Sequence, residues 1–85
     1  MSKHEKLIKR FKSKPKDFTY EEMKTLLNRL GYEEENKGKT SGSRVIFYNE
    51  QLQHSIFLHK PHPGNIIKSY LMKYIEDELT AKGLI

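Results

Sequence analysis

Apolar residues recur at helical spacing in three stretches of the chain. In the first, residues 2–14, a narrow apolar stripe predicts a short amphipathic helix, which Pro15 ends because proline has no backbone N–H to donate. The second stretch follows Thr19, and Gly31 is suited to end it. Its apolar residues are three or four positions apart, so one helix face should pack on a core: Met23, Leu26, Leu27 and Leu30.

Hydrogen-bonding residues indicate where the second and third helices begin. Thr19 and Glu22 have the spacing of a capping box, in which the hydroxyl and the carboxylate accept hydrogen bonds from unpaired backbone N–H groups. Asn65 is the expected N-cap of the last helix, which should begin near Ile66 and end at Gly83. The apolar face of this helix is formed by Ile67, Leu71, Tyr74 or Ile75, and Leu79.

Between these two helices the pattern is typical of β-strands. Residues 44–48 alternate and are rich in β-branched and aromatic side chains, and residues 54–59 return after a turn at 49–51, which predicts an antiparallel hairpin. Residues 32–36 are a candidate first strand. The order helix, helix, three strands, helix predicts an α+β fold, in which helices pack on a small three-stranded antiparallel sheet.

The length allows one domain with a small core. A chain of 85 residues is too short to hold a separate cofactor-binding domain beside a catalytic one, so we expect no cofactor. The only candidate boundary lies at the proline of residues 14–16. We therefore expect residues 1–14 to form an accessory N-terminal helix and residues 15–85 to form the functional domain.

The composition favours a polyanionic partner. The formal net charge is +5 and the pI is about 9.5, and nucleic acid is the most abundant polyanion in a cell. The absence of cysteine excludes disulfides and thiolate metal sites. No apolar run is long enough to cross a membrane, and the basic N-terminus lacks a hydrophobic signal core, so we expect a cytoplasmic protein.

Two histidines lie close together before the last helix, at His59 and His62. Histidine gives or takes a proton near neutral pH, so this pair is a candidate general base and acid for RNA cleavage, activating a 2′-hydroxyl and protonating the leaving 5′-oxygen without a metal. The alternative is structural, with Pro61 and Pro63 setting a turn and His59 closing the strand. The pair lacks a neighbouring carboxylate and makes a weak metal site, so we expect none.

The loop at residues 37–44 combines glycine, hydroxyl and cationic side chains. Glycines let backbone amides approach an anion, and Lys39 and Arg44 add positive charge, so the loop is a candidate phosphate site. It is not a Walker loop, because a strand follows it instead of a helix. The alternative is a solvated hairpin loop.

Several aromatic residues are candidates for stacking on nucleic acid bases. Core packing is the favoured interpretation, because Phe47 and Phe57 lie on neighbouring strands and can be cross-strand partners. Tyr70 and Tyr74 are four apart on the last helix and are also expected in the core. His54, like His4, has an exposed-looking position and is assigned no role.

The order and spacing of several segments resemble those of HicA-type mRNA interferase toxins. The resemblance spans residues 17–85 and has its basis in Lys14-Pro15-Lys16-Asp17-Phe18-Thr19, Leu30-Gly31-Tyr32, Gly42-Ser43-Arg44-Val45-Ile46-Phe47, His59-Lys60-Pro61-His62-Pro63 and Gly83-Leu84-Ile85. It implies a fold similar to double-stranded-RNA-binding domains and metal-independent cleavage of mRNA. It also implies a HicB-type antitoxin partner that covers the active surface.

One residue departs from the family pattern. The usual catalytic histidine follows Gly-Ser at the start of the second strand, where this chain has Arg44. Arginine stays charged at neutral pH and cannot act as a base, but it can clamp a phosphate or stabilise a pentavalent transition state. We therefore assign catalysis to His62, His59 and Arg44. The expected RNA contacts are Lys39, Ser43, Arg44, Lys60 and Lys68.

Two other functions remain open from the sequence. One is an RNA-binding module of the same fold that does not cut RNA, since Arg44 replaces the usual histidine. The other is an adaptor that binds only protein. Salt discriminates the adaptor, because affinity for RNA falls steeply with ionic strength, whereas a hydrophobic protein interface is much less sensitive.

Overall fold

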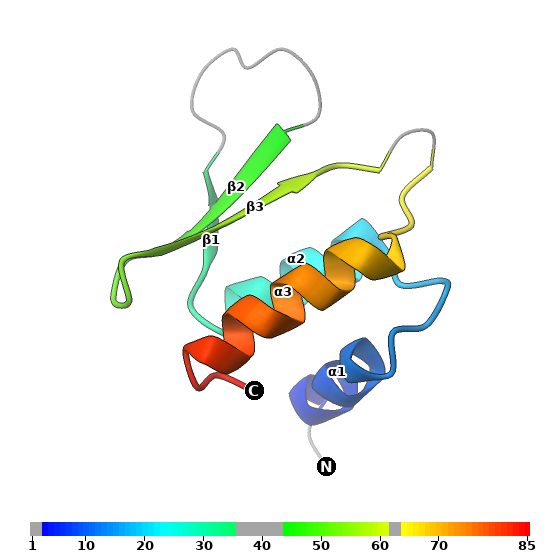
Figure 1. Cartoon of the computed structure of the whole chain (residues 1–85), viewed down its shortest axis with the longest axis horizontal. Helices are drawn as coiled ribbons and strands as arrows, with labels where there is room; N and C mark the ends of the chain where they lie inside the picture. The colour runs from blue at the N-terminus through cyan, green and yellow to red at the C-terminus, as the bar shows by residue number, and fades with distance from the viewer. Residues whose placement is uncertain (1–2, 36–43, 62–63) are drawn as a thin grey trace.

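The computed structural model describes residues 3–35, 44–61 and 64–85. Three helices and a three-stranded sheet follow one another in the predicted order, which confirms the α+β fold. Figure 1 shows α2 and α3 on one side of the sheet, with α1 beyond them. The elements are α1 (Lys3–Lys12), α2 (Tyr20–Arg29), β1 (Glu33–Glu35), β2 (Arg44–Asn49), β3 (His54–His59) and α3 (Ser69–Ala81).

The sheet is antiparallel, in the order β1-β2-β3. Its register pairs Phe47 with Ile56 and Ile46 with Phe57. Neighbouring residues of a strand point to opposite faces, so Phe47 lies on the core face and Phe57 on the outer face. The predicted hairpin is confirmed, but the prediction that Phe47 and Phe57 are cross-strand partners is wrong.

The capping box at the start of α2 is confirmed. The Thr19 hydroxyl accepts a hydrogen bond from the Glu22 N–H at 3.1 Å, and a Glu22 carboxylate oxygen accepts one from the Thr19 N–H at 3.0 Å. At the other end, Gly31 has a φ of +98°, a conformation that suits glycine, and the chain turns directly into β1. These two ends fix the length of α2 and its entry into the sheet.

One apolar core lies between the sheet and the helices. Helix α2 contributes Met23, Leu26 and Leu27, and α3 contributes Met72, Ile75 and Leu79. The core face of the sheet contributes Val45, Phe47, Ile56 and Leu58. Because both helices cover the same face, the outer face, which carries Arg44, Phe57 and His59, is uncovered by them.

Helix α1 and the residues that follow it contact the rest of the fold through a buried aromatic ring and ion pairs. The Phe11 side chain is fully buried and lies 5.7 Å from the ring of Phe18, centroid to centroid. The Arg10 guanidinium contacts Glu22 at 2.7 Å, and Lys14 pairs with Glu76 of α3. The sequence predicted an accessory helix here, and the proposed boundary after residue 14 stays a prediction.

Helix α3 begins later than predicted. Its N-cap is Lys68, without a side-chain capping bond, so the prediction that Asn65 caps a helix near Ile66 is wrong. The backbone before the helix is extended and pairs with the segment before α2. The Tyr20 N–H donates to the Asn65 carbonyl and the Ile67 N–H donates to the Phe18 carbonyl, both at 2.7 Å. The Ile67 N–H would lack an intrahelical acceptor in a helix that began at Ile66, and the pairing with Phe18 satisfies it instead.

Two polar contacts show how α3 lies along β3. Glu78 contacts His54 at the start of the strand, and the Tyr74 hydroxyl accepts a hydrogen bond from the Phe57 N–H at 3.5 Å. Residue numbers in the helix fall as residue numbers in the strand rise, so the two elements run in opposite directions. None of the described helices combines the length and the apolar character that crossing a bilayer requires.

Candidate functional site

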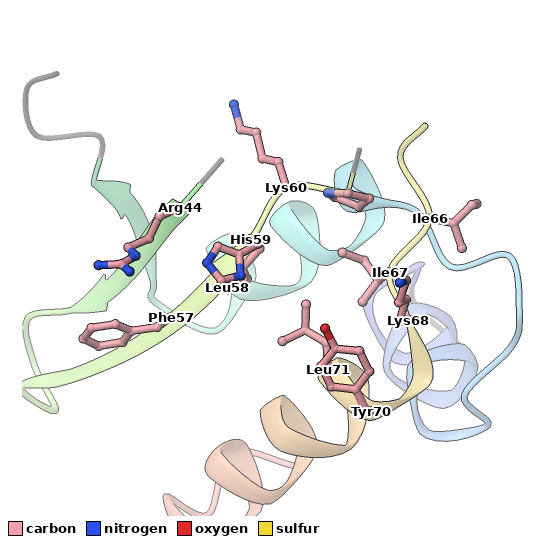
Figure 2. A pocket seen from close by; sticks show the side chains of 11 residues that line it. Arg44, Phe57, Leu58, His59, Lys60, Ile66, Ile67, Lys68, Tyr70 and Leu71 are labelled. Carbon is pink, nitrogen blue, oxygen red and sulfur yellow. The ribbon is translucent and has the colours of Figure 1, made fainter. Parts of the chain in front are cut away.

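A groove opens where the end of β3 faces the start of α3. It has a volume of about 1170 Å³ and takes residues from β2, β3, the segment after β3 and the first turn of α3. Figure 2 shows Arg44 and Phe57 on one side and Lys68 and Tyr70 on the other, with His59 between them. The apolar floor is formed by Leu58, Ile67 and Leu71.

Arg44 and His59 are direct cross-strand neighbours at the open end of the β2–β3 hairpin. Both are exposed, while the next residues inward, Val45 and Leu58, are buried. Side chains directly opposite each other in an antiparallel pair have Cβ atoms about 5 Å apart. The guanidinium and the imidazole therefore share one end of the hairpin, where both are open to solvent.

The start of α3 adds positive potential to the other wall. Lys68 is the N-cap, no acidic residue lies in the first helical turn, and no side chain caps the helix. The helix dipole therefore favours an anion at this end. Among the described residues that line the groove there is no carboxylate, so its electrostatic character is cationic.

Lys60 lies at the margin between this groove and a smaller neighbouring pocket of about 350 Å³. Its ammonium group is 5.6 Å from the centre of the Tyr20 ring, within reach of a cation–π interaction. In Figure 2 the side chain extends away from the other groove residues. Burial, followed by the nearby Glu34 carboxylate, raises the pKa of Tyr20, so the hydroxyl keeps its proton at neutral pH and cannot act as a base.

The structure brings four of the predicted site residues to this one groove. Arg44, His59, Lys60 and Lys68 all line it, although they come from different elements. Lys39, Ser43 and His62 lie outside the described residues. The roles assigned to all seven residues stay predictions.

For two aromatic residues of the groove, Phe57 and Tyr70, the sequence favours core packing over stacking on bases. Phe57 is 52% exposed and Tyr70 is 71% exposed, so the prediction that they belong to the core is wrong, as it is for Tyr74 at 37%. Phe57 lies between two other apolar residues, Ile56 and Leu58. Because all three are apolar, the sequence does not show which of them face the core. Tyr70 carried a usable signal, since it lies off the helical stripe of Met72, Ile75 and Leu79.

His54 also differs from its prediction. Its side chain is only 12% exposed, and its two ring nitrogens contact the Tyr32 hydroxyl and the Glu78 carboxylate. His54 does not line the groove, so its contacts stabilise the fold and do not belong to the candidate site. Within the described part of the chain, no three histidine, aspartate or glutamate side chains gather as a metal site would require.

Comparison with known proteins identifies the family. The family described as HicA toxin of bacterial toxin-antitoxin matches residues 20–82, which includes every described residue of the groove and leaves out α1. No curated protein and no solved structure is significantly similar to the chain. The family match covers most of the chain, in agreement with the resemblance seen in its motifs. The chain therefore belongs to the HicA toxin family of bacterial toxin–antitoxin systems.

Proposed function

We propose that the protein binds and cleaves mRNA at the groove and thereby inhibits translation as the toxin of a type II system. The observation that carries the proposal is the meeting of Arg44, His59 and Lys68 around one groove whose described lining has no carboxylate. Such a surface attracts the phosphate backbone, and it has no negative side chain among its described residues to repel it. Family membership supports the same activity.

The proposed reaction is an internal transesterification. A base removes the proton of a ribose 2′-hydroxyl, the 2′-oxygen attacks the adjacent phosphorus, and the P–O5′ bond breaks. An acid protonates the leaving 5′-oxygen, which gives a 2′,3′-cyclic phosphate and a 5′-hydroxyl. We assign the two proton transfers to His59 and His62, and the stabilisation of the pentavalent phosphorus to Arg44.

Further cations would hold the RNA on both sides of the cut. Lys60 and Lys68 line the groove and are proposed to contact neighbouring phosphates. Lys39 and Ser43 are proposed for the same role from the sequence alone, since they shortly precede Arg44 in the chain and lie outside the described residues. Each lysine would act as a point charge, whereas Arg44 can hold a phosphate with two parallel hydrogen bonds.

A second candidate function is RNA binding without cleavage. It is favoured by Arg44, which replaces the histidine of the family pattern with a side chain that cannot accept a proton at neutral pH. In this case the same groove holds RNA and the histidines only bind. The proposed partner for either function is a HicB-type antitoxin that covers the groove and excludes RNA.

The test is cleavage of a defined RNA by the purified protein in EDTA, with the product ends identified. We expect cyclic phosphate and 5′-hydroxyl ends. His59→Ala and His62→Ala should each slow cleavage by about 10²- to 10⁴-fold. Lys73→Ala is the matched control, because Lys73 is exposed, pairs only with Asp77 among the contacts described and does not line the groove.

Three results would change the proposal. Tight RNA binding that falls steeply with salt, without any cleavage, would favour the silent binding module. Cleavage that requires magnesium would contradict the histidine mechanism. The protein adaptor would be favoured if the folded protein bound no RNA and its antitoxin affinity changed little with salt.

A further inference from the structure

Exposed aromatic rings flank the cationic groove on both sides. Phe57 and Tyr70 are the two most exposed large hydrophobic residues in the described part of the chain. Phe57 lies on the outer face of β3, beside the wall that carries Arg44, and Tyr70 lies on the first turn of α3, beside Lys68. Figure 2 shows both rings at the groove and His59 between them.

The alignment of α3 along β3 places Tyr70 near His59. His54 contacts Glu78, and Phe57 contacts Tyr74 one helical turn earlier. A further step of two residues along the strand is about 7 Å, and one more turn of the helix is about 5 Å. The direction of α3 thus carries Tyr70 toward the end of β3, and both Tyr70 and His59 line the groove. Arg44 and His59 are cross-strand neighbours, and Figure 2 shows Tyr70 on the far side of His59 from Arg44.

This combination of charge and exposed rings favours an unpaired RNA strand over a duplex. In a duplex the base faces are stacked on one another, and a protein contacts mainly phosphates and 2′-hydroxyls. In a single strand the base faces are accessible, and proteins hold them on aromatic side chains while cations track the backbone. A duplex would use the cations of this groove but would leave both rings without a partner.

We propose that the groove binds single-stranded RNA, with one base stacked on Tyr70, a second base stacked on Phe57, and the phosphate between them at Arg44 and His59. The proposal rests on the proposed function and names its substrate class. Stacking would fix the sugar and the phosphate of one nucleotide step beside the imidazole. Phe57 and Tyr70 are thus positioning residues, since the reaction itself needs no atom of either ring.

The test measures the binding of two fluorescent RNA probes. One is a short strand with 2′-O-methyl sugars, which cannot be cleaved by 2′-oxygen attack, and the other is the same strand annealed to its complement. We expect the single strand to bind at least about ten times more tightly. Tyr70→Leu and Phe57→Leu should each weaken its binding by about 5- to 100-fold, as expected for one lost stack.

Matched variants separate stacking from hydrophobic surface and from folding. Tyr70→Phe keeps the ring and should bind like the parent, whereas Tyr70→Leu keeps apolar bulk without a flat face. Leu52→Ala removes an exposed apolar side chain that does not line the groove and should change nothing. Duplex binding should be equal for all of these variants. Circular dichroism of each variant confirms that it is folded.

Several outcomes would overturn the inference. If the duplex binds as tightly as the single strand, or if both leucine variants bind like the parent while Arg44→Ala binds weakly, the proposed function stands and the stacking does not. If the leucine variants lose only antitoxin affinity, the rings belong to a protein interface. If the folded parent neither binds nor cuts any RNA, the proposed function fails together with the inference.

Discussion

The Nε2 atom of His54 lies 2.8 Å from a carboxylate oxygen of Glu78, and this contact joins the first residue of β3 to α3. The other ring nitrogen contacts the hydroxyl of Tyr32, the residue immediately before β1. Burial, followed by the charge of Glu78, raises the pKa of Tyr32, so its hydroxyl stays protonated and can donate to His54. Three segments that are distant in the sequence are therefore joined at one imidazole.

Removing this imidazole should destabilise the fold. His54→Ala leaves the buried Tyr32 hydroxyl and the Glu78 carboxylate without the partner described here, and we expect a loss of about 1–3 kcal/mol in the free energy of unfolding. Urea denaturation measures it. Lys73→Ala, which breaks an exposed pair, should cost less than about 0.5 kcal/mol. Equal stabilities of the two variants would show that the contact contributes little.

Phe11→Ala tests whether α1 is part of the core. Because the ring is fully buried against Phe18, its removal should lower the free energy of unfolding by about 3–5 kcal/mol. Lys12→Ala, on the exposed side of the same helix, is the control. A small effect of Phe11→Ala would support an accessory helix that the remaining domain does not need. The measurement is thermal or urea unfolding at matched protein concentration.

The ion pair between Arg10 and Glu22 should make stability depend on acid. The hydrogen bond from Arg10 holds the pKa of Glu22 below its ordinary value of about 4.5. When the pKa of a carboxyl group is lower in the folded protein than in the unfolded one, its charge stabilises the fold at any pH above the pKa of the unfolded state. This stabilisation is lost as the pH falls through the pKa of the folded state. The stability difference between the parent and Glu22→Gln should therefore shrink below about pH 4.5. A difference that stays constant from pH 7 to pH 3 would contradict the pairing.

Gly31 should tolerate alanine less well than Gly83. Both have positive φ, which costs a residue with a side chain about 1–2 kcal/mol. A Cβ at Gly31 would also lie 2.9 Å from the Asn49 amide nitrogen, which donates to the Leu30 carbonyl, whereas nothing lies within 4 Å of a Cβ at Gly83. We expect Gly31→Ala to cost at least about 1 kcal/mol more, because Asn49 must move and lose a hydrogen bond. Urea midpoints of the two variants give the comparison.

Local sequence signals predicted those parts of the fold that depend on neighbouring residues. The Thr19 and Glu22 pair begins α2 as expected, because both partners of a capping box lie within one helical turn. The hairpin followed from strand alternation in the same way. The predicted start of α3 was wrong, because the segment at Ile66 pairs with Thr19. No local sequence pattern reveals such a distant partner.

The same distinction explains the site. Residue type, position in the predicted elements and the family pattern identified Arg44, His59, Lys60 and Lys68 as groups that suit a phosphate, and the structure brings them to one groove. Phe57 was missed because its register partner, Ile46, depends on the length of the turn between the strands. Outside the site, the structural contacts of His54 were missed because its partners, Tyr32 and Glu78, come from segments on either side of it.

The register of the β2–β3 hairpin also sets the order in which the groove can assemble. Asn49 and His54 pair beside the turn, whereas Arg44 and His59 form the most distant pair of the ladder. A hairpin that zips from its turn reaches the Arg44–His59 pair last, because that pair is the farthest from the turn. A partly folded chain therefore separates the guanidinium from the imidazole, and only a fully zipped sheet presents both to one ligand.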